Sequence, residues 1–209
     1  KYVSKEGAVP KINKLGSKEW EKTKARINER VNEIAERLVN LYSLRAQKEG
    51  FQFEKDDDLQ LAFENDFGYD LTRDQQSTLQ EIKNDMEQPQ PMERLLCGDV
   101  GFGKTEVAIR AAFKCVMDGK QVAVMVPTTV LAQQHYLTFK ERTRNFGVNV
   151  ELLNRFCTPK EQRRILQDLE DGKVDILIGT HRLLQADVLF PDLGLLIIDE
   201  EQRFGVAQK

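Results

Sequence analysis

Long hydrophobic runs are absent from this sequence of 209 residues. A membrane-spanning helix needs about 18 or more consecutive apolar residues, and no stretch approaches that length. The first residues, KYVSKEGAVPK, also lack the apolar segment of a secretory signal peptide. We therefore expect an intracellular, cytoplasmic protein that makes no membrane contact.

Cysteine is scarce, and its three copies are widely separated. Cys97, Cys115 and Cys157 are odd in number and include no C-x-x-C pair. A disulfide framework and a structural zinc site both need closer or more numerous cysteines. We expect three small thiols that are buried or half-buried.

An excess of one charge is also lacking, because the net charge is only −3. Overall charge therefore does not point to a nucleic-acid partner. The distribution is more informative: residues 1–48 carry twelve Lys and Arg against six Glu, whereas residues 49–70 carry eight acids and one lysine. Such a change suggests a boundary between modules, although a solvated helix face followed by an acidic loop would look the same.

A long amphipathic helix is predicted near the N-terminus. Residues 1–16 look irregular, and apolar residues then recur at spacings of three, four and seven up to Gly50. We expect a connector helix at residues 17–50 and a separate domain at residues 51–209. The stripe consists of Trp20, Ile27, Val31, Ile34, Leu38 and Leu41 or Tyr42.

Strands and helices alternate through the second half of the chain, after two helices expected at 59–67 and 72–87. This alternation predicts an α/β fold, a parallel sheet with helices on both faces. No internal repeat and no low-complexity tract interrupts it. The expected strands are 94–98, 121–127, 148–153, 174–180 and 193–199, and the helices between them are 104–118, 129–144 and 159–171.

The segment GDVGFGKT fits the phosphate-loop pattern G-x-x-x-x-G-K-T, between an expected strand and an expected helix. Backbone N–H groups of such a loop surround phosphates, and the helix N-terminus adds positive potential. Lys104 is expected to reach the β- and γ-phosphates of ATP, and Thr105 to hold Mg²⁺. A dinucleotide-type loop is disfavoured, because Glu106 stands where its third glycine belongs. The expected nucleotide contacts are Gly98, Asp99, Val100, Gly101, Phe102, Gly103, Lys104 and Thr105.

Two carboxylates follow the last expected strand. The apolar run LLII leads to Asp199 at the carboxyl edge of what should be a central strand, where a carboxylate would complement the Mg²⁺ at Thr105. Glu200 would orient and deprotonate an attacking water. The pair fits phosphoanhydride hydrolysis. An acidic cap for a following helix is the alternative, and it suits Glu201 better than Asp199.

Phe67 and Gln75 precede the phosphate loop and could recognise adenine. The amide of Gln75 could pair with the base edge while Phe67 packs on its face. The segment Thr72-x-x-Gln75 is also a capping box for the helix that it opens, and both roles are compatible.

Five segments together resemble a known family: LTRDQ, GDVGFGKTEVAIRAA, VPTTVLAQQH, GTHRLL and LLIIDEEQRFG. The set is similar to the first RecA-like motor domain of superfamily 2 helicase-type ATPases. Within that superfamily it resembles the double-stranded DNA translocases, the group of the reversal helicases and the transcription-repair coupling factors. The residues of the phosphate loop and of IIDEEQRFG resemble those of the coupling factors more than those of the reversal helicases.

The resemblance implies residue roles that the residues alone do not. It places Thr128, Gln133, Thr180 and His181 on the DNA backbone, and it makes Gln202 a catalytic residue that senses the γ-phosphate. Without it, Pro127–Thr129 and Gly179–Thr180 would be ordinary strand-to-helix turns with hydroxyl caps. His135 is expected to pack on a helix face.

The resemblance also implies partners: double-stranded DNA, RNA polymerase bound through the N-terminal side, and nucleotide-excision repair proteins. It makes residues 1–16 the end of a polymerase-binding module and residues 51–209 the first RecA-like motor domain, truncated at its C-terminal end. Motors of this family hydrolyse ATP between two such domains, and the second supplies an arginine finger. We therefore expect this chain to be a fragment with little ATPase activity alone.

Three other functions stay open from the sequence. A reversal helicase shares the same motifs. A P-loop kinase or GTPase is another possibility, although no N-K-x-D guanine motif follows the phosphate loop. Residues 1–48 could also make the chain a binding adaptor.

Overall fold

The computed structural model describes residues 18–46 and 48–200. Their contacts form two compact units, with the boundary between Lys48 and Glu49. The lead-in expected at residues 1–16 lies outside the described residues. Across the two described stretches, no helix is both long and apolar enough to cross a membrane.

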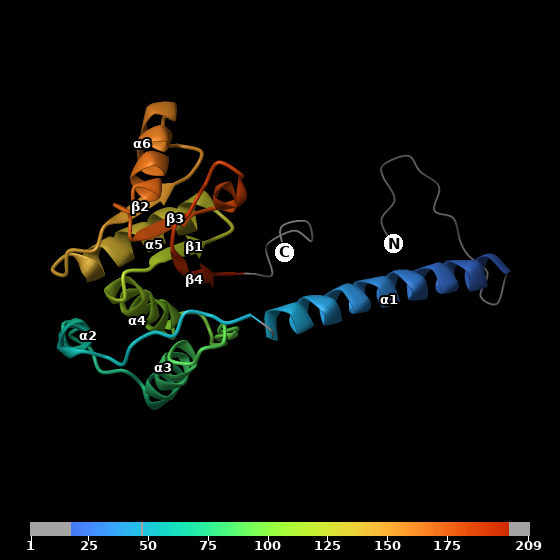
Figure 1. The fold of residues 1–209 in the computed structure, drawn as a ribbon, viewed down its shortest axis with the longest axis horizontal. Coiled ribbons are helices and arrows are strands. Elements are labelled where there is room, and N and C mark those ends of the chain that lie inside the picture. Colours follow the sequence, from blue (N-terminus) through green and yellow to red (C-terminus); the bar gives the residue numbers. More distant parts are fainter. Residues whose placement is uncertain (1–17, 47, 201–209) are drawn as a thin grey trace. The chain divides into compact units, whose positions relative to one another are not determined.

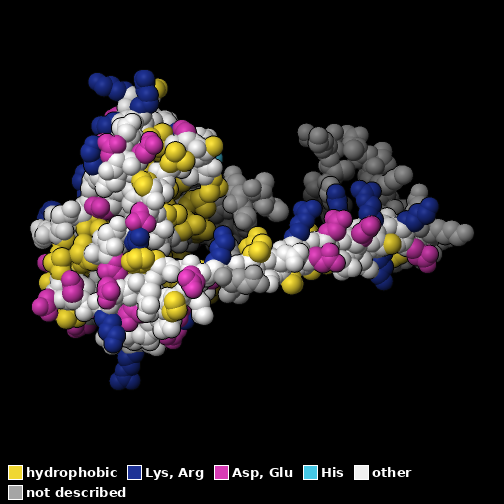
Figure 2. Space-filling model, in the orientation of Figure 1, with side chains coloured by type: hydrophobic (Ala, Val, Ile, Leu, Met, Phe, Trp, Pro, Cys, Tyr) yellow, Lys and Arg dark blue, Asp and Glu magenta, His cyan; other side chains and the backbone are white. Residues whose placement is uncertain are grey.

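The first unit contains one helix, α1 (Lys18–Ala46), which is 29 residues long. The long helix expected from the apolar stripe is therefore present. Four members of the stripe, Ile27, Val31, Ile34 and Leu38, expose half or more of their surface. Charged side chains of both signs occupy much of the remaining surface of α1 (Figure 2).

The second unit is built on a parallel sheet of four strands in the order β2-β3-β1-β4 (Figure 1). The two inner strands, β1 and β3, are buried along their whole length. Val124 pairs with Ile178 on one side and with Ile197 on the other. The strands are β1 (Gln121–Met125), β2 (Val150–Leu153), β3 (Ile176–Gly179) and β4 (Leu193–Ile198).

Helices cover both faces of this sheet, as the alternating sequence predicts. One core contains Val122, Val124, Ile176 and Ile178 together with residues of the helices on that face. The second core contains Met125, Leu153 and Leu177, which point to the other face because side chains alternate along a strand. The first face carries α2 (Asp58–Asn65), α3 (Arg73–Met86), α4 (Lys104–Met117) and α5 (Thr129–Thr143), and the second carries α6 (Pro159–Glu170) and the 3₁₀ helix η1 (His181–Leu184).

The strand expected at residues 94–98 is wrong, because no strand forms there. The Arg94 guanidinium instead binds the carboxylates of Glu81 and Asp85 on α3, which holds the start of this segment against a helix. Leu95 is 79% exposed.

Strand β4 is consequently an edge strand, not the central strand expected from its apolar run. Leu193, Leu196 and Ile198 are 41–49% exposed on it. Hydrophobic side chains gather on this side of the second unit (Figure 2). The carboxyl end of β4 still lies at the same edge of the sheet as the ends of the other three strands, since all four are parallel.

The cysteines are free, as expected, but one is placed differently. Cys115 is buried and Cys157 half-buried, whereas Cys97 is exposed. Its exposure follows from the missing strand, because residue 97 belongs to the segment that does not join the sheet.

Candidate functional site

The glycine-rich loop leads directly into α4, whose first residue is Lys104. Gly101 and Gly103 have φ angles of 86° and 70°, a left-handed conformation that side chains other than glycine rarely adopt. Val100 and Phe102 expose 95% and 65% of their surface, so the loop is open to solvent. Its conformation allows a ligand to reach the unpaired N–H groups at the start of the helix.

Lys104 folds back over this loop. Its ammonium Nζ donates to the carbonyl oxygens of Gly98 at 2.6 Å and Asp99 at 2.9 Å. Both acceptors are neutral, and an anion forms a stronger bond to an ammonium than a carbonyl does. A phosphate group could therefore replace these two bonds without breaking an ion pair.

Gln75 links the start of α3 to the phosphate loop. The expected capping box is present, because Gln75 Oε1 accepts from Thr72 N at 2.8 Å and Thr72 Oγ1 accepts from Gln75 N at 3.3 Å. The amide Nε2 of Gln75 also donates to Phe102 O at 2.7 Å. A Cβ on Gly103 would lie 2.5 Å from that nitrogen, so glycine is needed for this close approach. The contact with adenine expected for Gln75 stays a prediction.

Asp199 directly follows β4, and its backbone N–H extends the sheet by donating to Met125 O at 3.0 Å. Its carboxylate is held at both oxygens: Oδ2 lies 2.8 Å from His135 Nε2, and Oδ1 accepts from Glu200 N at 3.0 Å. Glu200 has a φ of 53°, which is unusual for a residue with a side chain. Backbone strain of this kind concentrates at functional sites.

The phosphate loop and Asp199 lie at the same edge of the sheet. Helix α4 ends at Met117 and β1 begins at Gln121, and from so short a connection we infer that α4 runs antiparallel to β1 with its N-terminus toward the carboxyl edge. Thr105 and Asp199 therefore bring a hydroxyl and a carboxylate to one edge, the oxygen ligands that Mg²⁺ prefers. The described residues contain no cluster of three or more metal-binding side chains.

The four residues expected to contact DNA follow strands that end at this edge. Thr128 caps α5 by accepting from Leu131 N at 3.2 Å, as expected for a turn hydroxyl. Thr180 is only 5% exposed and makes no side-chain cap bond with η1, so its expected capping role is wrong. Gln133 and His181 are exposed and accessible to a partner.

A surface groove of about 580 Å³ begins beside Gln133, the one member of these four that lines it. It runs between α5, the end of β2 and α6. Its lining combines amide, hydroxyl and apolar groups, including Thr129, Asn154 and Phe156. Phe156 is 70% exposed at the carboxyl end of β2.

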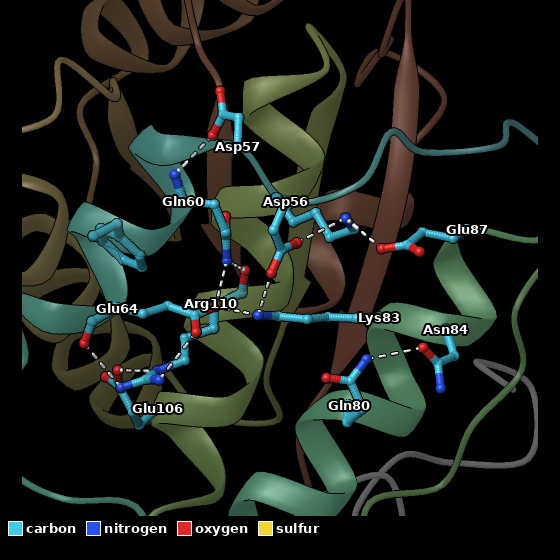
Figure 3. A network of polar contacts seen from close by, with 12 residues as sticks. Asp56, Asp57, Gln60, Glu64, Gln80, Lys83, Asn84, Glu87, Glu106 and Arg110 are labelled. Carbon is cyan, nitrogen blue, oxygen red and sulfur yellow. Dashed lines mark hydrogen bonds and ion pairs between the residues drawn. The ribbon is translucent and has the colours of Figure 1, made fainter.

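A network of buried charges joins α2, α3, α4 and the acidic segment before α2 (Figure 3). Lys114 Nζ lies 2.9 Å from both Asp56 Oδ1 and Glu87 Oε1, and Lys83 pairs with Asp56 and Glu64. Burial alone would raise the pKa of Asp56, but the hydrogen bonds and charges of Lys83 and Lys114 outweigh it and lower the pKa. The network fixes the acidic segment before α2 against α3 and α4.

The comparisons with known proteins now decide the family. A family model described as "DEAD/DEAH box helicase" matches residues 72–209, which is about two thirds of the chain. The chain belongs to the DEAD/DEAH box helicase family.

Two curated relatives of this helicase domain are named transcription-repair-coupling factor. Those of Staphylococcus aureus (strain USA300) and Staphylococcus epidermidis are each 57% identical over all 209 residues of this chain. The chain spans 18% of the length of these relatives.

Two solved structures resemble the helicase domain. RecG bound to a three-way DNA junction covers 79% of this chain, with 42% identity and a TM-score of 0.74, and the match spans 23% of the RecG chain. A hypothetical ATP-dependent RNA helicase from Sulfolobus tokodaii covers 70% of this chain and 42% of its own, with a TM-score of 0.54. At 18% identity, this second match supports the fold alone.

Within the helicase domain, the structure joins Gln75 to the phosphate loop and His135 to Asp199, whereas Gln202 lies outside the described residues. The contact of His135 with Asp199 was not expected, because His135 was assigned to packing. The two residues are 64 positions apart. No spacing rule within one helix could have indicated their contact.

Proposed function

We propose that this helicase domain binds ATP together with Mg²⁺ and is the first motor domain of a double-stranded DNA translocase. The observation that carries the proposal is a glycine-rich phosphate loop that opens α4 in a parallel-sheet domain whose strand β4 ends at Asp199. The contact between Gln75 and that loop supports it, because a base-reading side chain would then sit at a fixed place beside the phosphates.

Each residue has a specific role in this proposal. Lys104 binds the β- and γ-phosphates, while Thr105 and Asp199 hold Mg²⁺, partly through water. The metal, when bound, neutralises developing charge on the phosphates. Glu200 orients and deprotonates the attacking water, and Gln202 responds to the γ-phosphate. Phe67 and Gln75 contact the adenine.

The longer protein would use this domain to move along duplex DNA. We assign Thr128, Gln133, Thr180 and His181 to its phosphate backbone, which gives contacts without sequence preference. Identity of 57% to transcription-repair-coupling factors supports a cytoplasmic protein that displaces stalled RNA polymerase and recruits repair proteins. RNA polymerase would bind on the N-terminal side of the helicase domain.

Calorimetric titration of the chain with ATP and with GTP, each with Mg²⁺, tests the nucleotide part of the proposal. We expect ATP to bind and GTP to bind more weakly, because Gln75 can read the adenine edge. Preference for GTP, or binding of neither nucleotide, would contradict the assignment. Transfer of phosphate to a small molecule would instead favour a P-loop kinase.

A reversal helicase is the second candidate, favoured by 42% identity to RecG with a TM-score of 0.74. The two candidates differ in the DNA on which the longer protein works. Removal of a stalled polymerase from linear duplex would favour the first candidate. Efficient regression of a branched junction, with no effect on polymerase, would favour the second.

A further inference from the structure

Glu106 follows Thr105 in the first turn of α4, and its side chain is only 6% exposed. Two arginines bind it. Arg110 Nε lies 2.8 Å from Oε1, and Arg142 on α5 reaches Oε1 through Nη2 at 2.9 Å and Oε2 through Nε at 3.0 Å. Figure 3 shows the Glu106 and Arg110 side chains meeting beside α2. A buried carboxylate needs such pairing, because leaving it unpaired costs several kcal/mol.

The same two guanidinium groups hold the end of α2. Arg142 Nη2 donates to Phe63 O at 3.0 Å, and Arg110 Nη2 donates to Glu64 O at 3.2 Å. Cations at a helix C-terminus satisfy carbonyls that have no partner within the helix. The C-terminal end of α2 is thus bound by side chains that Glu106 also binds, in addition to the ion pair of Lys83 with Glu64 and the stacking of Phe63 on Phe113.

Phe67 lies just after α2 and faces both arginines. The Cζ atoms of Arg142 and Arg110 are 5.1 Å and 5.5 Å from the centroid of its ring. Both distances are within the range of a cation–π contact. The two arginines that contact the Phe67 ring both bind the carboxylate of Glu106. Glu106 directly follows Thr105 in the sequence.

We propose that Glu106 is a positioning residue for the nucleobase. Through Arg110 and Arg142 it holds Phe67 at a set place relative to the phosphate loop, so that base and phosphates are bound with one fixed separation. The inference rests on the proposed ATP site and adds a determinant of base recognition that does not touch the nucleotide.

The test separates binding of the base from binding of the phosphates. Affinities of the full 209-residue chain for ATP and for inorganic tripolyphosphate, both with Mg²⁺, would be measured by calorimetry. We expect Glu106→Gln and Arg142→Lys to weaken ATP about tenfold while tripolyphosphate affinity changes less than twofold. Arg144→Gln is the matched control, because Arg144 is an exposed neighbour that pairs only with the surface residue Glu141 among the ion pairs found here. It should leave both affinities unchanged.

Circular dichroism would establish that each variant is folded. An equal loss for ATP and tripolyphosphate would overturn the inference, and so would ATP affinity equal to that of the parent. If Glu106→Gln does not fold, Arg142→Lys decides, since it keeps the charge and removes only the forked geometry. Unfolding of both variants would assign the network to stability alone and also overturn the inference. A parent chain that binds neither ligand would instead contradict the proposed function.

Discussion

The imidazole Nε2 of His135 lies 2.8 Å from the carboxylate Oδ2 of Asp199. His135 belongs to α5, whose N-terminal residue follows the Thr128 turn, and Asp199 belongs to the candidate metal site. Thr128, one of the residues expected to contact DNA, caps the N-terminus of α5. The hydrogen bond therefore joins this helix to the carboxylate that is expected to hold Mg²⁺.

We predict that His135→Ala weakens Mg²⁺-dependent ATP binding, because the carboxylate loses the group that orients it. Loss of such a supporting contact typically costs about 10–100-fold in metal affinity. Titration with Mg²⁺ at fixed ATP would measure the effect. Thr138→Ala, one turn further along α5 on an exposed position, is the control. Unchanged Mg²⁺ dependence in His135→Ala would show that the contact is packing only.

Lys104→Ala should abolish tight Mg-ATP binding and leave the melting temperature of the domain nearly unchanged. The ammonium bonds only two loop carbonyls among the contacts found here, so the core does not depend on it. Removal of one charge-assisted contact should weaken binding by about 1.5–3 kcal/mol. Calorimetry and thermal denaturation would test both parts. ATP affinity equal to that of the parent would remove the phosphate-loop assignment.

Asp199→Asn and Glu200→Gln should impair different steps in the longer protein. The first removes a charge that faces the metal, so Mg²⁺-dependent nucleotide binding should fall. The second should leave ATP bound but unhydrolysed, because only the transition state uses that carboxylate. Nucleotide affinity and single-turnover hydrolysis would be compared. Equal loss of affinity in both variants would refute the division of roles.

Asp175→Asn should stabilise the domain at neutral pH. Burial raises the pKa of Asp175 in spite of the hydrogen bond from Asn149 N at 2.7 Å. A raised pKa means that the ionised group disfavours folding above the folded-state pKa, and this cost disappears below the unfolded value of about 3.9. The melting temperature of the variant should therefore exceed that of the parent at pH 7 and converge with it in acid.

Asp187→Asn is the control of opposite sign. Hydrogen bonds from Arg182 lower the pKa of the Asp187 carboxyl, so its ionised form favours folding. Its loss should slightly lower the melting temperature at neutral pH, and the difference should disappear in acid. The same pH trend in both variants would contradict the burial argument.

Alkylation should distinguish the three cysteines. Burial raises the pKa of the Cys115 thiol to about 12, which leaves a thiolate fraction of about 10⁻⁴ at pH 8. Iodoacetamide should therefore modify the exposed Cys97 first and Cys115 only after unfolding. Because Cys97 adjoins Gly98, bound Mg-ATP should slow its modification. Mass spectrometry of timed samples would measure these rates, and early labelling of Cys115 would contradict its burial.

Much of the fold follows from local patterns that the sequence displays. The helix at Arg73–Met86 begins where the Thr72 and Gln75 capping box indicates, and all four strands begin within two residues of their expected starts. These features depend on residues a few positions apart. The strand expected at 94–98 fails because its first residue is bound by two acids of α3, which a local pattern does not reveal.

The candidate site likewise has parts that the sequence predicts and parts that it does not. The phosphate loop and Asp199 are recognisable because their residues are contiguous in sequence. The contacts that orient them are not: Glu106 meets Arg142 across 36 positions, and Gln75 meets Phe102 across 27. Such charged and amide pairs look like ordinary surface residues in a sequence, because either partner alone is compatible with a solvated helix.

Helix α4 and strand β1 are two stiff elements joined by only Asp118, Gly119 and Lys120. The first begins at the phosphate loop, and the second leads into the Thr128 turn. In the proposed motor, a small displacement of Lys104 would be transmitted along α4 to β1, or it would be absorbed by bending of the backbone at Gly119, whose φ is 73°. The mechanical compliance of that short turn would then set how much of a nucleotide-driven movement reaches the opposite end of β1.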